Sequence, residues 1–88
     1  MKILIDKSFE RDAKRLSIQI QQQVKVTIEQ LIAAKSLQEV KCTKMEGAKN
    51  AFRIRLGSHR IGFYLEDNQV VLSRVLDRKD IYKYFPKK

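Results

Sequence analysis

Arginines alternate with apolar side chains in two neighbouring segments of the C-terminal half. Residues 51–56 contain Arg53 and Arg55 between three apolar residues, and in residues 60–65 Arg60, Gly62 and Tyr64 alternate with three more apolar residues. A period of two is that of a β-strand, in which successive side chains point to opposite faces of the sheet. A hairpin of these two strands therefore places three guanidinium groups on one face.

Such a cluster needs a compensating partner, because like charges directly opposite one another destabilise a sheet. A polyanion supplies one, since the Arg fork binds phosphate with two hydrogen bonds. The whole chain has 19 Lys+Arg against 10 Asp+Glu, a net charge of +9. This charge favours nucleic acid, an anionic membrane surface or an acidic protein as partner. The alternative is a solvated sheet face that is basic by chance.

The N-terminal half predicts the elements that support this face. Residues 2–6 alternate as a short strand, and segments 8–16 and 18–35 have helical periodicity, with Ser8 and Ser17 as N-caps. We expect the two helices to pack antiparallel. The longer one has an apolar stripe that we assign to the core, formed by Ile20, Val24, Ile28, Leu31 and Ile32.

Residues 36–50 lack a clean period and predict a connection. Three strands of an antiparallel meander follow, over residues 51–56, 60–65 and 69–76. Residues 77–80 break the last strand, and residues 81–85 predict one helical turn. The predicted fold is α+β: an N-terminal strand, a helical hairpin, a three-stranded antiparallel meander and a short C-terminal helical turn. Residues 1–88 are expected to form a single domain.

The cysteine content and the apolar runs indicate a cytoplasmic, soluble protein. Cys42 is the single cysteine, so no intramolecular disulfide forms, as is usual in a reducing compartment. The N-terminus lacks the apolar run of a secretory signal, and residues 31–34 are too short to span a bilayer. We expect no membrane association.

Two C-terminal segments resemble motifs of the RelE/ParE superfamily of toxins. Residues 52–64, Phe-Arg-Ile-Arg-Leu-Gly-Ser-His-Arg-Ile-Gly-Phe-Tyr, are similar to its Y-R-I-R-x-G-x-Y-R-I-x-Y segment. Residues 75–82, Val-Leu-Asp-Arg-Lys-Asp-Ile-Tyr, are similar to V-x-H-R-K-D-I-Y. Phe9 to Leu16 follow F-x-x-D-x-K-x-L, so the resemblance covers essentially the full chain. It implies a RelE-like domain and the toxin of a type II toxin–antitoxin system.

The RelE branch of the superfamily implies an mRNA interferase that inhibits translation. Such a toxin cuts mRNA in the ribosomal A site without a metal or other cofactor. The 2′-hydroxyl attacks the adjacent phosphate and leaves a 2′,3′-cyclic phosphate. The implied catalytic residues are Arg53, Arg55, Arg60, Arg78 and Tyr82. We expect further RNA contacts from Lys41, Lys44, Lys49, Lys79 and Lys83. Fixed guanidinium groups suit the charge that develops on a phosphorane, and Tyr82 can stack on a base.

The sequence departs from the family at the general base. Arginine stays protonated in proteins, so neither Arg53 nor Arg55 can accept the proton. Asp77 stands where the family has the histidine of its H-R pair. His59 is expected to point away from Arg60, and Cys42 has no histidine near it in sequence. The sequence therefore assigns no residue to the base.

Two other functions fit the same pattern. A ParE-like toxin would keep the fold and inhibit DNA gyrase without cutting RNA, and a basic RNA-binding domain would bind without catalysis. Partners expected for the RelE-like function are mRNA on the ribosome and a cognate acidic antitoxin, with oligomers formed through the antitoxin.

Overall fold

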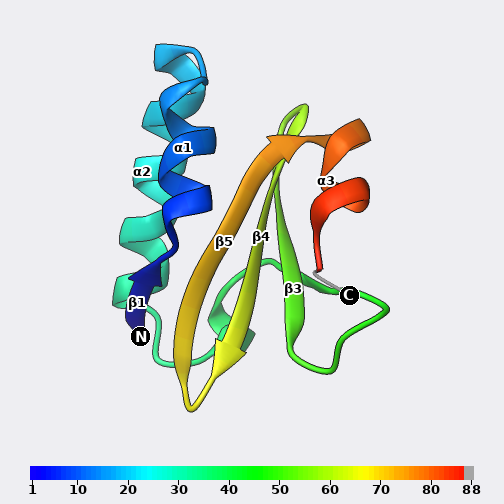
Figure 1. Ribbon diagram of the computed structural model, residues 1–88. Coiled ribbons are helices and arrows are strands. Elements are labelled where there is room, and N and C mark those ends of the chain that lie inside the picture. The colour runs from blue at the N-terminus through cyan, green and yellow to red at the C-terminus, as the bar shows by residue number, and fades with distance from the viewer. Residues whose placement is uncertain (87–88) are drawn as a thin grey trace.

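The computed structural model describes residues 1–86, which fold into a mixed five-stranded sheet with helices on both faces (Figure 1). The strands are β1 (Lys2–Ile5), β2 (Thr43–Lys44), β3 (Ala51–Leu56), β4 (His59–Glu66) and β5 (Gln69–Asp77). The helices are α1 (Lys7–Lys14), α2 (Ile18–Ala33) and α3 (Arg78–Tyr84), with a 3-10 turn at Leu37–Glu39. The sheet order is β1-β5-β4-β3-β2, with β1 parallel to β5 and the other pairs antiparallel. The predicted α+β fold is confirmed.

Helices α1 and α2 form an antiparallel hairpin over one face of the sheet (Figure 1). The main core lies between them and the strands, formed by Phe9, Val24, Leu31, Ile54, Ile61, Phe63, Val70, Leu72 and Val75. The Ser17 cap is confirmed, because its Oγ accepts a hydrogen bond from the Ile20 amide at 3.3 Å. None of the helices in residues 1–86 is both long and apolar enough to cross a membrane.

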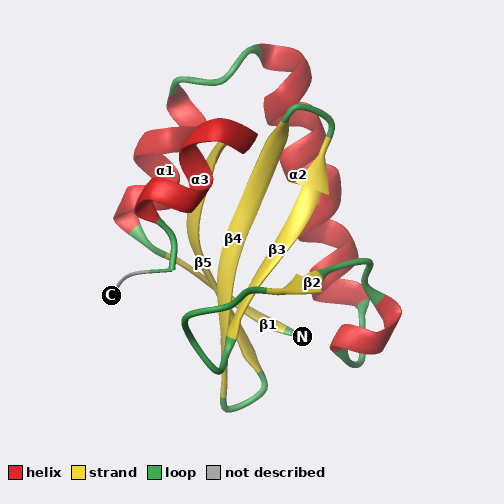
Figure 2. Cartoon of the chain, turned by 90° about the vertical axis from the view of Figure 1, so that its right-hand side faces the viewer, coloured by secondary structure: helices red, strands yellow, loops and turns green. Residues whose placement is uncertain are grey.

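Helix α3 covers the opposite face, the one on which the arginines were predicted to lie (Figure 2). A second, smaller core forms there from Met45, Ala51, Ile81 and Phe85. The Phe85 ring lies directly against Gly62 of β4, where a Cβ atom would approach Phe85 Cδ2 to 2.5 Å. Gly62 is therefore required by the close approach of the chain after α3.

A β-bulge sets which side chains of β5 face each layer. Gly62 pairs with Arg74 but Phe63 pairs with Leu72, so Ser73 is an additional residue on β5. Because of the bulge, Leu72 and Val75 both face the helical hairpin, although they are three residues apart. Arg74, between them, faces α3.

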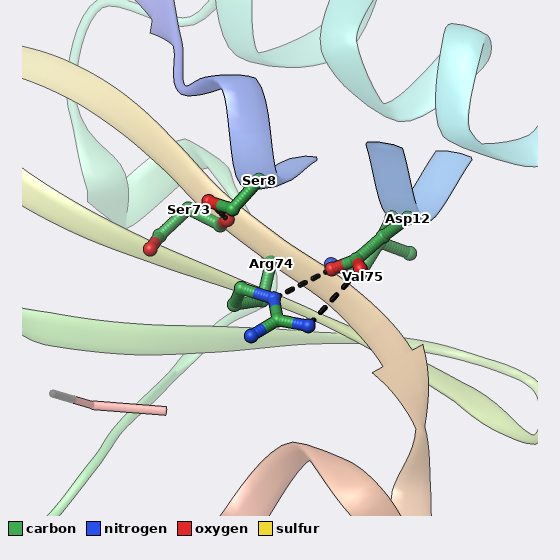
Figure 3. Close-up of polar contacts among 5 residues, drawn as sticks. All are labelled: Ser8, Asp12, Ser73, Arg74 and Val75. Carbon is green, nitrogen blue, oxygen red and sulfur yellow. Dashed lines mark hydrogen bonds and ion pairs between the residues drawn. The ribbon is translucent and has the colours of Figure 1, made fainter. Parts of the chain in front are cut away.

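Strand β1 is shorter than β5, and α1 completes the edge that β1 leaves uncovered (Figure 3). The Ser8 hydroxyl donates to the Ser73 carbonyl oxygen at 2.7 Å, and Asp12 Oδ2 accepts from the Val75 amide at 3.1 Å. Side chains of a helix thus satisfy backbone groups that a longer neighbouring strand would otherwise satisfy.

Several local predictions were wrong. Ser8 is not the N-cap of α1, because Asp6 takes that position and the Ser8 hydroxyl is used on β5. Ile32 is 57% exposed rather than part of the core, because it lies on the solvent side of α2. The connection at residues 36–50 contains the edge strand β2, whose two residues pair with β3. Residues 77–80 do end the last strand, which stops at Asp77, but the helix begins at Arg78 rather than at residue 81, since Asp77 caps α3 by accepting from the Lys79 amide at 2.8 Å.

We predict that Gly62→Ala destabilises the fold by about 1–3 kcal/mol, the usual cost of overpacking, because the new methyl group overlaps Phe85. Urea unfolding of the wild type and the variant measures this loss. Phe85→Leu provides the matched background, in which the same glycine substitution should cost less. Equal costs in both backgrounds would show that the Phe85 contact is not the reason.

Candidate functional site

The strand register gathers three of the implied catalytic arginines on the face that carries α3. Arg55 lies directly opposite Arg60, and Arg53 lies opposite Gly62 on the same face. The predicted alternation is thereby confirmed. Arg78 is the first residue of α3, and its amide donates to the Ser58 carbonyl oxygen at 2.9 Å. This bond places the start of α3 beside the β3–β4 turn, next to Arg55 and Arg60.

Arg60 is the most enclosed of these arginines, at 9% exposed. Its Nη1 donates to the carbonyl oxygens of Gly57 at 2.7 Å and His59 at 2.9 Å, which fixes the guanidinium against the turn. Burial lowers the pKa of Arg60 from its ordinary value, and the charges of Arg55, Arg53 and Arg78 lower it further. The protonated guanidinium therefore stands in an environment that disfavours its charge.

Carboxylates do not balance this cluster. Within residues 1–86, ion pairs join Arg74 to Asp12 and Lys83 to Asp80, and neither pair includes Arg53, Arg55, Arg60 or Arg78. The charge of Asp77 acts on Arg60 in the opposite sense, but it is the last of the contributions to the pKa of Arg60. Four arginines thus face a common region whose positive charge Asp77 offsets only in part, and a bound anion would relieve both the repulsion and the desolvation.

Tyr82 projects from α3 onto Arg53, whose Cζ lies 5.4 Å from the ring centroid. The Tyr82 side chain is 56% exposed, so the part of the ring that does not contact Arg53 faces solvent. Both residues line a cavity of about 620 Å³ between β2, the loop after it and the C-terminal end of the described chain. The structure therefore brings all five implied catalytic residues to one side of the sheet.

A second cleft, of about 930 Å³, lies between the C-terminal part of α2 and the outer edge of β3. Arg53, Arg55 and Arg60 line it, so Arg53 belongs to both cavities. Strand β2 pairs with only Phe52 and Arg53 of β3. The cleft thus continues along the part of β3 that β2 does not cover.

The five lysines predicted to contact RNA occupy different places. Lys41 lines the cleft beside α2, and Lys44 lines the cavity that holds Tyr82. Lys49 lines a shallow hollow next to Lys44. Lys79 and Lys83 are exposed on α3 and line neither of the two larger cavities, and Lys83 pairs with Asp80 at 3.7 Å.

Neither His59 nor Cys42 is well suited to act as the general base. His59 pairs with Leu56 and Asp77, on the opposite face from Arg60, which confirms that it points away from the cluster. Its Nδ1 lies 3.1 Å from the Ser58 hydroxyl. Cys42 is half-buried and packs on the main core, and burial raises the pKa of its thiol, which disfavours the thiolate.

Glu46 is a residue that the sequence reasoning missed. It is exposed and lines the cavity of Arg53 and Tyr82, where it carries the one carboxylate of the described lining. In the sequence it stands out as the single acid between Lys41 and Arg60. That isolation within a basic segment was the available signal, but only the path of the loop shows that Glu46 lines the same cavity as Tyr82.

The fold and the arginine face define a toxin of the RelE/ParE superfamily, and the chain belongs to this superfamily. Residues 3–82 match the family described as the ParE toxin of the type II toxin–antitoxin system parDE. This match spans nearly the whole described chain and confirms the resemblance found in the sequence.

Particular relatives lie on the RelE side. The chain is 39% identical to Toxin RelE3 of Methanocaldococcus jannaschii over 88 residues, covering 98% of this chain and 100% of the relative. The RelB–RelE antitoxin–toxin complex of Methanococcus jannaschii includes a chain that matches with 36% identity and a TM-score of 0.80, covering 94% of this chain and 99% of that one. The intact E. coli RelBE complex matches in fold, with 16% identity, a TM-score of 0.70, and coverage of 86% and 94%.

We predict that sulfate raises the melting temperature more than chloride does at equal ionic strength, because a divalent anion binds the arginine cluster. At ten times its Kd a ligand stabilises the folded state by about 1.4 kcal/mol, which corresponds to several degrees for a domain of this size.

The Arg55→Ala variant should lose most of this difference. Arg11→Ala removes the same charge from an exposed position on α1 and serves as the control for general salt effects. An equal sulfate effect in both variants would contradict anion binding at the cluster.

Proposed function

We propose that the protein is an endoribonuclease toxin that cuts mRNA on the translating ribosome. The observation that carries this proposal is the cluster of Arg53, Arg55, Arg60 and Arg78, which lacks carboxylate partners in the described chain. An RNA phosphate supplies the missing anion, and the exposed ring of Tyr82 offers a stacking surface beside it. The 39% identity to a protein named Toxin RelE3 supports the RelE branch.

The proposed reaction is an internal displacement at phosphorus. The 2′-oxygen forms a bond to the adjacent phosphorus while the bond from phosphorus to the 5′-oxygen breaks, and the products are a 2′,3′-cyclic phosphate and a 5′-hydroxyl. The non-bridging oxygens gain negative charge in the transition state. Guanidinium groups that are already oriented, as Arg60 is by its two carbonyl contacts, stabilise that charge without reorganisation.

Glu46 is our candidate for the general base. Its carboxylate can take the proton of the 2′-hydroxyl, a transfer that a guanidinium cannot perform. Glu46 shares a cavity with Arg53 and Tyr82, and solvent water reaches the same side to protonate the leaving 5′-oxygen. The assignment fills the role that the sequence left open.

The second candidate is a gyrase inhibitor, and the match to the family of ParE toxins favours it. This function keeps the fold but has no need of a phosphate site next to a carboxylate and an exposed tyrosine. Assays of mRNA cleavage and of DNA supercoiling with the same preparation separate the two functions.

We propose an acidic antitoxin as the protein partner, as in the RelB–RelE complex that the chain resembles. A net charge of +9 favours an acidic segment. Large apolar side chains exposed on α2 (Ile18, Val26 and Ile32) offer additional contact area. Co-expression with the neighbouring small open reading frames should yield a stable complex, and failure of every acidic product to co-purify would contradict the partner.

We predict that Arg53→Ala and Arg78→Ala each lower the rate of mRNA cleavage by roughly 10²–10³-fold, because each removes a group that stabilises transition-state charge. Purified toxin, added to translating ribosomes, gives cut mRNA whose ends are mapped. Arg11→Ala removes an exposed charge from α1, away from the arginine face, and should retain most of the activity. Intact mRNA together with inhibited supercoiling by the wild type would favour the gyrase function instead.

We predict that Glu46→Gln lowers the maximal cleavage rate by roughly 10²-fold or more while RNA binding changes little, since the amide keeps the shape but accepts no proton. Single-turnover cleavage at saturating RNA measures the chemical step. Glu29→Gln is the matched control, because this carboxylate is exposed on α2 and lines neither of the two larger cavities. If both variants cut like the wild type, Glu46 is not the base.

A further inference from the structure

Asp12 is a buried carboxylate, 4% exposed, that takes no part in the proposed reaction. It lies on α1, and Figure 3 shows its side chain reaching across the edge of β5. Its oxygens accept hydrogen bonds from Arg74 Nε at 2.7 Å, Arg74 Nη2 at 3.1 Å and the Val75 amide at 3.1 Å. The bond from the Val75 amide completes the edge of the sheet, whereas the two bonds from Arg74 fix the plane of its guanidinium group.

The same guanidinium has a second partner on the far side. Arg74 Cζ lies 5.2 Å from the ring centroid of Tyr84, on α3. The hydrogen bond with Asp12 raises the pKa of Arg74, and burial opposes it. A short chain of contacts therefore runs from α1, through one side chain of β5, to α3.

Two arginine–tyrosine contacts, on opposite sides of α3, hold this helix against the sheet. Tyr82 and Tyr84 are two residues apart, so they point about 200° apart around the helix. Tyr82 lies on Arg53 of β3, and Tyr84 lies on Arg74 of β5. Between them Phe85 sits on Gly62 of β4. The two arginine–ring contacts thus set the rotation of α3 about its own axis, which buried apolar contacts alone leave less defined.

We propose that Asp12, acting through Arg74 and Tyr84, is a positioning residue that fixes α3 and thereby holds Tyr82 and Arg78 towards the RNA. The last step rests on the proposed function; the coupling between α1 and α3 does not. Without the Asp12 carboxylate, Arg74 would keep its charge. It would lose the pair of hydrogen bonds that orients the plane of its guanidinium group against the Tyr84 ring.

Substitutions can separate this role from simple stabilisation. Arg74→Met keeps much of the hydrocarbon packing and removes both the fork and the ring contact. Tyr84→Leu removes the ring alone, whereas Tyr84→Phe keeps the ring and should restore wild-type behaviour. Asp12→Asn keeps an oxygen for the Val75 amide but weakens the bond to Arg74. The exposed Lys83–Asp80 pair on the same helix provides the control, Lys83→Ala.

Amide hydrogen exchange in the full-length protein tests the coupling directly. In Asp12→Asn, Arg74→Met and Tyr84→Leu, the amides of α3 should exchange about tenfold faster, while those of the β3–β4 hairpin stay protected. Tyr84→Phe and Lys83→Ala should match the wild type, and combining Arg74→Met with Tyr84→Leu should add little to either variant alone. Unchanged exchange in α3, or an equal rise throughout the sheet, would overturn the positioning role.

Cleavage of mRNA provides the second readout. Arg74→Met and Asp12→Asn should lower the maximal rate by about tenfold, and Tyr84→Phe should not. If the exchange of α3 rises as expected but these variants cut as fast as the wild type, the positioning of Tyr82 and Arg78 is overturned. If the wild type cuts no RNA, the proposed function fails, and the exchange data still decide whether Asp12 couples α1 to α3.

Discussion

Most of the architecture depends on how the edge of β5 is completed. Strand β1 covers only the first part of β5, and beyond it the Ser8 and Asp12 side chains of α1 satisfy the backbone. This arrangement fixes α1 along the strand at the β-bulge, where Ser73 is the additional residue. Because the bulge turns Arg74 towards α3, the same few contacts connect the helical hairpin, the sheet and the C-terminal helix (Figures 1 and 3).

The opposite face combines a small apolar core with an excess of positive charge. Phe85 and Ile81 hold α3 on the sheet, and its exposed Arg78 and Tyr82 lie next to the strand arginines. A protein that only needed stability would not bury Arg60 among like charges, since desolvation and repulsion both act against it. The arrangement is understandable if an anion binds there, and the proposed RNA phosphate is such an anion. Under the proposed function, RNA binding at Arg60 would therefore oppose the stability of the free protein.

The sequence predicted the elements better than their connections. Period-two alternation placed Arg53, Arg55 and Arg60 on one face, because the side-chain period of a strand is independent of the rest of the fold. It did not predict the β-bulge, the helix-capped edge of β5 or the two residues of β2, since each depends on partners distant in sequence. Glu46 was missed for the same reason. The catalytic roles of the gathered residues remain predictions that the geometry supports and that only activity measurements test.

The most direct test of the account concerns the attacking oxygen. An mRNA that carries a single 2′-deoxynucleotide on the 5′ side of the scissile phosphate keeps the phosphate, the bases and the codon, but it lacks the 2′-hydroxyl that we propose as the nucleophile. Both mRNAs are translated by ribosomes in the presence of purified toxin. The deoxy-substituted mRNA should stay intact at that position, while the all-ribose mRNA should be cut to a 2′,3′-cyclic phosphate. Cleavage of the deoxy-substituted mRNA at the same phosphate and rate would contradict the account.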